Sequence, residues 1–446
     1  MLQTLKKTIQ NKLNADDRLK EVIEKGTIAF VFKILGVIMF FLFNMSVTYF
    51  VNTEAWGIFS LFYPVVNIVS IIAIFGCDTA MVRFMSEYFS TGQTAKAKGI
   101  YLQILKMVLL FAFSFSILLF FLSPLLAWYF KNNNLQNIFY IGSFCVLPMT
   151  ITALHSEALR GIKKIKEFSY VQQGTQFGLA LLFFVCYAIF KIPVNSIPVI
   201  AFIISMWLIA AWSIYLFRKH SGFKYTQVGT SDYGSLKLIE WVFPMFLSGF
   251  LQIVMSWTDI LILGHYVTAD KVGIYRTSLQ IAGSTSMALF AINTIVAPKF
   301  SELYTKNDMQ GLSMVVRNTS RLMFILSVPV MLLIFLFPRI ILSIFGSDYT
   351  VDEAVYTLFI LTISQLFNVG FGSVLILLNM TGKQKIVQNI VIVATIINIS
   401  LCILLIPYWG IIGAAIANAI NMLIWNTIAA LYIKKHYNIW TIAFLQ

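Results

Sequence analysis

The sequence predicts an all-α integral membrane protein with twelve transmembrane helices arranged as two pseudo-symmetric six-helix bundles. Three observations lead to this class: 59% of the 446 residues are hydrophobic, only 11% are charged, and long apolar runs recur from end to end. Soluble domains carry about 25% charged residues. A run of roughly 20 apolar residues is long enough to cross a hydrocarbon core of about 30 Å.

Short polar or basic stretches separate the expected spans. In chain order the spans cover residues 26–50, 57–79, 100–125, 136–158, 169–190, 196–217, 238–264, 273–296, 319–345, 353–379, 386–406 and 410–433. In the charged lead, residues 1–25, the leucines and isoleucines fall roughly on one helical face. We expect an amphipathic helix on the cytoplasmic membrane surface there, with a solvated tail as the alternative. The six-helix bundles then occupy residues 26–225 and 226–446.

The net charge of +14 follows the membrane topology and does not indicate a nucleic-acid partner. With the N-terminus in the cytoplasm, 25 of the 32 Lys and Arg residues fall in cytoplasmic segments. The outer loops hold only four, Lys131, Lys191, Lys271 and Arg339. By the positive-inside rule, this distribution predicts that both termini are cytoplasmic.

The chain repeats itself at an offset of 216 residues. Gly57-Ile58-Phe59 is answered by Gly273-Ile274-Tyr275, Arg83-Phe84 by Lys299-Phe300, and Arg218-Lys219-His220 by Lys434-Lys435-His436. Six spans in each half give both halves the same orientation, so they are related by an axis along the membrane normal. Transporters built in this way bind substrate between their repeats and rock one against the other. A duplicated scaffold without transport activity is the alternative.

The first span carries a polar stripe inside its apolar sequence. Lys33, Asn44 and Thr48 lie three turns and then one turn apart, on one helical face. A charge in mid-membrane costs at least about 2.5–3.5 kcal/mol, so such a residue usually lines a cavity or finds a partner. Lys33 therefore faces a cavity, or its long stem reaches back to the cytoplasmic interface.

The seventh and eighth spans carry similar stripes. On the eighth, Arg276 is followed by Gln280, and on the seventh Gln252 and Ser256 precede Asp259. Arg276 has no counterpart in the first half, where Ser60 holds the matching position. Two interpretations stay open: Arg276 contacts substrate, or it pairs with Asp259 as a clip between helices.

Oxygen ligands in the second half suggest a cation. Asp259, Asn398 and Asn418 together offer one carboxylate and two amide oxygens, which hard cations such as Na⁺ accept. Hydrogen bonds between helices are the commoner use of such amides and are the alternative.

The duplicated six-span pattern, the Gly-Ile-aromatic entry to the second span and the basic–aromatic pair that follows it resemble the polysaccharide and O-antigen flippases of the multidrug/oligosaccharidyl-lipid/polysaccharide exporter superfamily. This resemblance implies a V-shaped exporter fold that moves a polyprenyl (undecaprenyl)-diphosphate-linked oligosaccharide from the inner to the outer leaflet by alternating access. It places the protein in the bacterial cytoplasmic (inner) membrane, as a monomer in surface polysaccharide synthesis beside glycan polymerase or ligase machinery. It also implies coupling to Na⁺ or H⁺.

Studied flippases of this superfamily have a cationic central cavity with basic residues on the first and eighth spans, where Lys33 and Arg276 stand here. A guanidinium fork matches phosphate oxygens, so we predict that Lys33, Asn44, Arg276, Gln280, Gln252 and Ser256 bind the substrate. The chain lacks the two extra C-terminal helices of the lipid II flippases and any basic residue within its second span. Another lipid-linked glycan is therefore favoured over a peptidoglycan precursor.

Two rival functions come from other classes. A cation-coupled multidrug exporter of the same superfamily needs acidic residues in its first bundle, whose spans here offer Lys33 and Lys106 instead. A membrane glycan polymerase or ligase generally carries a large outer loop, and every outer loop expected here is short. We expect no enzyme activity, because the sequence has no phosphate-binding glycine loop and no cluster with metal-ligand spacing.

Overall fold

The computed structural model describes residues 17–172, 175–189, 195–223 and 235–442, and within these ranges every regular element is helical. The helices are α2 (Asp17–Phe50), α3 (Thr53–Ile74), α4 (Cys77–Ser90), α5 (Thr94–Tyr129), α6 (Asn134–Gly161), α7 (Ile165–Gln172), α8 (Thr175–Ile189), α9 (Ile197–Ser221), α10 (Ser235–Tyr266), α11 (Ala269–Ser284), α12 (Met287–Thr305), α13 (Met309–Leu336), α14 (Pro338–Ser343), the short η1 (Ser347–Thr350), α15 (Asp352–Phe371), α16 (Val374–Met380) and α17 (Gln384–Tyr437).

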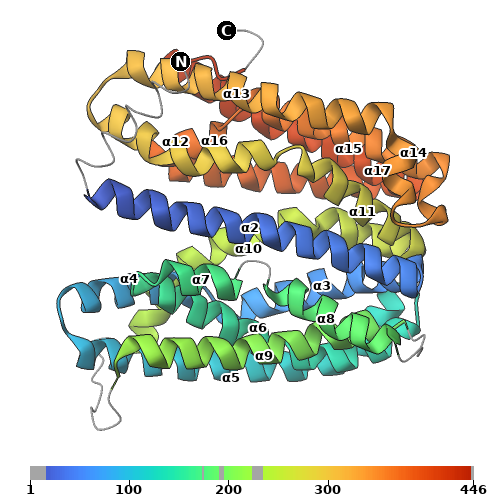
Figure 1. Cartoon of the computed structure of the whole chain (residues 1–446), viewed down its shortest axis with the longest axis horizontal. Helices are drawn as coiled ribbons and strands as arrows, with labels where there is room; N and C mark the ends of the chain where they lie inside the picture. Colours follow the sequence, from blue (N-terminus) through green and yellow to red (C-terminus); the bar gives the residue numbers. More distant parts are fainter. Residues whose placement is uncertain (1–16, 173–174, 190–194, 224–234, 443–446) are drawn as a thin grey trace.

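The long helices form two groups that lie one above the other in Figure 1. Helices α3–α9 make up the first group and α11–α17 the second, while α2 runs along the boundary between them. Helix α10 packs against α17 and also contacts α3 and α4, so it joins the two groups. The expected division between residues 225 and 226 and most of the lead at 1–25 lie outside the described residues, and α2 already begins at Asp17.

Eight helical segments of the described chain are long and apolar enough to cross a membrane. They are Val31–Phe50, Thr53–Ile74, Thr94–Tyr129, Asn134–Gly161, Ile197–Ser221, Met309–Leu336, Asp352–Met380 and Gln384–Tyr437. Large apolar side chains of α5 point outward, with Phe121 74% and Leu110 65% exposed. Such surfaces are stable against lipid and not against water, as expected for a multi-pass membrane protein.

Three expected spans are broken within the described residues: 57–79, 273–296 and 353–379, the last of them between α15 and α16 at Gly372 with φ 71°. The span expected at 273–296 stops at Ser284, and α12 starts only at Met287. The hydroxyls of Ser284 and Thr285 donate to the carbonyls of Ile281 and Ala282, three residues back. Local bonds of this kind compete with the regular helical ladder, so a run of hydroxyl residues ends the helix.

The span expected at 57–79 is broken as well. Phe75 and Gly76 both adopt positive φ values, 51° and 73°, which separate α3 from α4. A Cβ at Gly76 would lie 2.7 Å from the backbone nitrogen of Phe246 in α10, so this position accepts only glycine. The break thus lets α10 approach the first group closely.

The last two expected spans, 386–406 and 410–433, both lie in helix α17, which contains a sharp kink. Gly410 at the kink has φ 53° and ψ −128°, a conformation that glycine adopts without a steric penalty. A single residue therefore reverses the chain where the sequence predicts a turn.

Helix boundaries agree with the internal repeat. Helix α3 begins at Thr53 and α11 at Ala269, and α9 ends at Ser221 and α17 at Tyr437, each pair 216 positions apart. The residues that follow the last pair, Gly222 and Asn438, are both left-handed caps with φ of 64° and 55°.

The glycines of the repeated motif meet each other in space. A Cβ on Gly57 would lie 1.6 Å from the carbonyl oxygen of Ala269, and one on Gly273 would lie 2.9 Å from that of Thr53. The backbones of α3 and α11 therefore touch, and no other residue type fits at either position without moving a helix. This contact joins the two groups at the end of the molecule where both helices begin.

The close contact between α3 and α11 predicts that one methyl group added at Gly57 lowers the stability of the protein. Gly57→Ala places that methyl against backbone, so we expect a loss of roughly 1–3 kcal/mol of stability, as for overpacked cores. Thermal unfolding of the detergent-solubilised protein measures it. Gly249→Ala in α10 is the matched control, because nothing lies within 4 Å of its Cβ position. The unfolding midpoint of this control variant should equal that of the parent or lie slightly above it. If Gly57→Ala and the parent had equal midpoints of thermal unfolding, the backbones of α3 and α11 would not be in close contact at Gly57.

Candidate functional site

Helices α2 and α11 bring together polar residues that the sequence predicts for substrate binding. Asn44 is fully buried, and its Nδ2 donates to Thr277 Oγ1 at 3.1 Å and to Gln280 Oε1 at 3.3 Å. Asn44 Oδ1 and Gln280 Nε2 are also buried and have no hydrogen-bond partner in the described parts of the chain. A buried polar group without a partner costs about 1–3 kcal/mol, so these two atoms offer hydrogen bonds to a ligand.

Lys33 lies three turns before Asn44 on α2 and lines a pocket of about 210 Å³. Gln280 and Ser284 of α11 and Phe290 of α12 line the opposite side of this pocket. The Lys33 Nζ stands 4.4 Å from the centre of the Phe290 ring. Among the ion pairs between described residues none involves Lys33, so its charge is free for an anionic group.

Arg276 is held between aromatic rings. Its guanidinium carbon lies 4.6 Å from the Trp257 ring of α10 and 5.5 Å from the Phe40 ring of α2. Cation–π contacts of this kind contribute about 0.5–2 kcal/mol. Phe40 also lines the Lys33 pocket, so one aromatic side chain borders the pocket and contacts the Arg276 guanidinium.

The carboxyl of Asp259 is bonded to Tyr275. Its Oδ2 accepts a 2.5 Å hydrogen bond from the Tyr275 hydroxyl, and its Oδ1 accepts one from the Ile260 backbone nitrogen. Asp259 and Arg276, both of them described, form no direct ion pair with each other. Tyr275 therefore forms a clip between α10 and α11, and substrate contact by Arg276 stays a prediction.

A larger cavity of about 680 Å³ lies within the second group, between α10, α12 and α15–α17. Amides dominate its polar lining: Gln252, Asn293, Asn368, Asn379, Gln384 and Gln388. Trp425 of α17 and, at one edge, Lys385 complete the polar set. Phe290 is common to this amide cavity and the Lys33 pocket, so the two spaces adjoin.

An apolar groove of about 330 Å³ adjoins the Lys33 pocket on its other side. Helices α2, α11, α13 and α14 form it, and its lining is hydrophobic except for Ser284. Phe41 and Ser284 belong to both spaces. The apolar groove, the Lys33 pocket and the amide cavity therefore follow one another, from the α2–α11 interface into the second group.

The remaining predicted residues have local partners. The Ser256 hydroxyl donates to the Gln252 carbonyl within α10. Asn418 Oδ1 accepts from Ser364 Oγ at 2.9 Å, and Asn398 Oδ1 lies 3.9 Å from Cys402 Sγ. The bonds recorded for Asp259, Asn398 and Asn418 thus do not link the three to one another, and cation binding by this trio stays a prediction.

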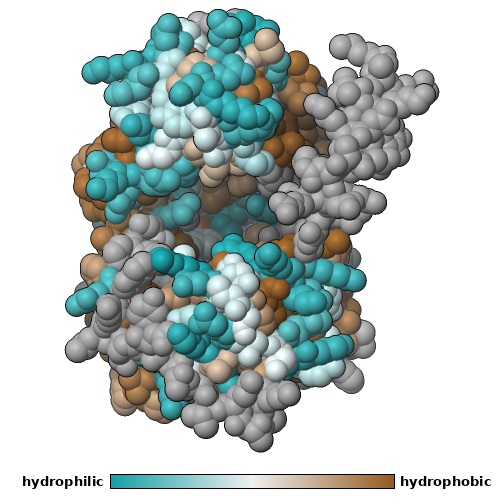
Figure 2. Space-filling model, turned by 90° about the vertical axis from the view of Figure 1, so that its left-hand side faces the viewer, coloured by the Kyte–Doolittle hydropathy of each residue, from teal (hydrophilic) through white to brown (hydrophobic). Residues whose placement is uncertain are grey.

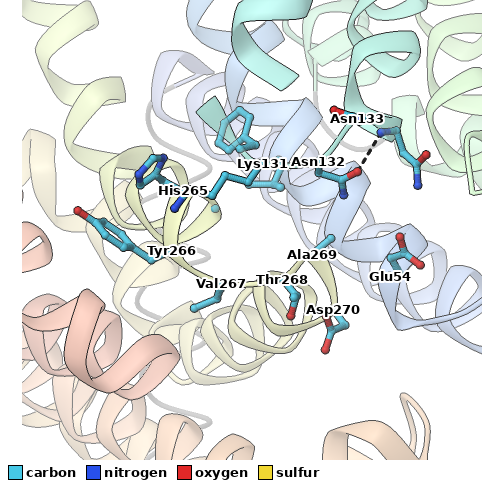
Figure 3. Close-up of a pocket in the computed structure, with 14 residues that line it drawn as sticks. Glu54, Lys131, Asn132, Asn133, His265, Tyr266, Val267, Thr268, Ala269 and Asp270 are labelled. Carbon is cyan, nitrogen blue, oxygen red and sulfur yellow. Dashed lines mark hydrogen bonds between the residues drawn. The ribbon is translucent and has the colours of Figure 1, made fainter. Parts of the chain in front are cut away.

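The two ends of the molecule differ. Figure 2 shows a hollow between the two groups on the face where α4 and α12 lie, with hydrophilic residues inside it. At the opposite end the α3–α11 contact closes the interface. A pocket of about 590 Å³ lies beside that contact, and Figure 3 shows Lys131 extending toward His265 and Tyr266 within it.

Sequence reasoning missed the aromatic members of the site, namely Phe40, Trp257 and Phe290. The chain contains 40 phenylalanines, most of which face lipid or the core, so composition and spacing select none of them. Trp257 follows Ser256 on a predicted polar stripe, which is the one signal that pointed near it.

Comparison with known families and proteins agrees with this architecture. The family model described as "Polysaccharide biosynthesis protein" matches residues 22–304, more than half of the chain, and the MatE model matches residues 244–404. The "Probable low-salt glycan biosynthesis flippase Agl15" of Haloferax volcanii is 30% identical over 41% of this chain and 39% of its own length. An uncharacterized membrane protein of Methanocaldococcus jannaschii is 25% identical over 82% of this chain and 75% of its own length.

Solved structures share the fold. The chain resembles an inward-facing multidrug resistance MATE family transporter of the MOP superfamily, with a TM-score of 0.74 and 13% identity over 92% of this chain and 98% of the other. It also resembles the lipid II flippase MurJ in an inward closed conformation, with a TM-score of 0.72 and 17% identity over 92% of this chain and 87% of the other.

The Asp259–Tyr275 bond predicts a stability effect. Tyr275→Phe leaves the buried carboxyl of Asp259 without its side-chain donor, so we expect a loss of about 1–3 kcal/mol. The midpoint of thermal unfolding in detergent reports it. Tyr408→Phe removes the same hydroxyl from a side chain that is 84% exposed and should leave the midpoint unchanged. If both variants have the same unfolding midpoint as the parent, the bond between Asp259 and Tyr275 does not stabilise the packing of α10 against α11.

Proposed function

Because the chain belongs to the polysaccharide biosynthesis protein family, we propose that it is a flippase for a polyprenyl-diphosphate-linked oligosaccharide. The observation that carries this proposal is the order of three adjoining spaces: an apolar groove and the Lys33 pocket at the α2–α11 interface, and then the amide cavity. A lipid-linked glycan has the same order of parts, namely an apolar chain, a diphosphate and a sugar.

The charge of the central space supports an anionic headgroup. Lys33 lines the central pocket, Arg276 contacts the Phe40 ring that borders it, and the nearby carboxyl of Asp259 is already bonded to Tyr275. Lys33 offers a mobile point charge, whereas Arg276 offers a planar fork that matches phosphate oxygens. The spare amide atoms of Asn44 and Gln280 add neutral hydrogen bonds beside them.

Transport then follows an alternating-access cycle. The twelve segments work as two six-helix bundles in the cytoplasmic membrane. The pairs α3 plus α4, α7 plus α8, α11 plus α12 and α15 plus α16 each serve as one span, and the two arms of α17 serve as two. The hollow of Figure 2 opens toward the cytoplasm, where the positive-inside rule places the basic helix ends and both termini. The glycine contact closes the outer end until the bundles rock apart. Na⁺ or H⁺ coupling through Asp259 belongs to the same proposal.

A cation-coupled multidrug exporter is the second candidate, and the MatE match over residues 244–404 favours it. A cationic drug would need carboxylates in its binding space. The described residues that line the Lys33 pocket and the amide cavity include no Asp or Glu, whereas they include Lys33 and Lys385. This lining favours the lipid-linked glycan.

The test is translocation of a fluorescent undecaprenyl-diphosphate-linked oligosaccharide in proteoliposomes. The parent should transfer it between leaflets, and Lys33→Ala and Arg276→Ala should each slow transfer roughly 10- to 100-fold, because a hydrogen bond to a charged group contributes about 1.5–3 kcal/mol. Lys106→Ala removes an exposed lysine of α5 and should keep the parent rate. A parent that moves fluorescent cations and not the lipid-linked glycan would overturn the proposal in favour of drug export.

A further inference from the structure

We infer that the amide cavity between α10, α12 and α15–α17 is the site that binds the sugar portion of the substrate, a neutral oligosaccharide. The inference rests on the proposed function for the lipid and diphosphate parts of the ligand. It adds a binding site in the second half of the chain, on the side of Phe290 away from Lys33.

The lining matches the chemistry of sugar hydroxyls. A hydroxyl both donates and accepts hydrogen bonds, and so does a side-chain amide, which carries two N–H donors and a carbonyl acceptor. Gln252, Asn293, Asn368, Asn379 and Gln388 bring five amides to one cavity. Amides at membrane depth are costly unless they bond to each other, to water in a cavity or to a ligand, so this many amides mark a polar cavity and not a lipid-facing surface.

Some of these amides form hydrogen bonds within the protein, and others form none among the described contacts. The Ser373 hydroxyl donates to Asn293 Oδ1, and Asn368 Nδ2 donates to Gln365 Oε1 at 3.3 Å. For the side chains of Gln252 and Gln388 the described contacts include no hydrogen bond. These two amides, on opposite walls formed by α10 and α17, are thus available to a ligand between them.

Trp425 supplies an independent observation. Its indole Nε1 is buried and has no hydrogen-bond partner within the described ranges. An indole N–H usually finds a partner when buried, and its absence costs about 1–3 kcal/mol. The indole also lines the cavity, so it offers both a donor and an apolar face, the combination that suits the polar edge and apolar face of a sugar ring.

The volume of the amide cavity and the charge of its lining limit the class of ligand that it can bind. The volume of about 680 Å³ lies in the range of about 300–1,000 Å³ typical of small-molecule sites. The described lining has no carboxylate to attract a cation, and its single charged residue, Lys385, lies exposed at the edge. Because Phe290 borders both this cavity and the Lys33 pocket, with Lys33 Nζ 4.4 Å from its ring, a sugar joined directly to a diphosphate at Lys33 reaches the cavity without a spacer.

A protection experiment tests binding directly. In a Cys186→Ser background, which removes the exposed native thiol, Gln388→Cys is labelled with a maleimide in detergent. Lipid-linked oligosaccharide extracted from the membranes of the producing organism should slow labelling at least several-fold, and undecaprenyl diphosphate should not. Equal protection by both lipids, or by neither, would overturn the glycan site. Because no transport is measured, this result stands apart from success or failure of translocation.

A transport comparison tests Trp425. Trp425→Phe keeps the ring and removes the N–H, so transfer of the glycan-bearing lipid should fall roughly 5- to 100-fold, the factor that corresponds to about 1–3 kcal/mol, while transfer of undecaprenyl diphosphate stays at the parent rate. Trp128→Phe, at a side chain that is 73% exposed, is the control. Loss of both activities would assign Trp425 to folding, and loss of neither would exclude it from binding. Either outcome contradicts the inference.

Discussion

The backbone contact between α3 and α11 is the constraint on which the rest of the structure depends. Because Gly57 and Gly273 have no side chains, the two helices touch at the closed end, where each begins. Tyr275, two residues after Gly273, then reaches Asp259 of α10, and Thr277 reaches Asn44 of α2. Three helices are thereby fixed around Arg276, which stands between Tyr275 and Thr277 in the sequence.

This arrangement explains why a repeated chain carries its arginine in one copy only. The glycines occur in both copies because each needs the other for the close approach. At the position after the motif, Ser60 is buried in the core of the first group, whereas Arg276 emerges between Phe40 and Trp257 at the interface. The duplication thus serves the contact between the halves, and in the proposed function the unmatched charge serves one anionic group.

The physics of the membrane made part of the site predictable. A lysine and an amide inside an apolar span are expensive, so Lys33, Asn44 and Gln280 stood out in the sequence, and the structure brings the stripes of α2 and α11 together. The helix breaks at Phe75 and Thr285 were not predicted, because an apolar run carries no sign of a positive φ or of a local hydroxyl bond. The bond between Tyr275 and Asp259 was not predicted for a related reason: charge pointed to Arg276 as a partner, and nothing in the sequence marks the neutral hydroxyl of the preceding residue. Phe290 could not be selected among 40 phenylalanines, because its role comes from its place between two cavities and not from its residue type.

In the proposed function, one ligand lies across three adjoining spaces. An electron cryo-microscopy structure of the parent protein with bound lipid-linked oligosaccharide tests this most directly. We predict density for the polyprenyl chain along the α2–α13 groove, for the diphosphate beside Lys33, and for sugar beyond Phe290 near Trp425 and Gln388. Headgroup density confined to the first group of helices, with the amide cavity empty, would contradict the account.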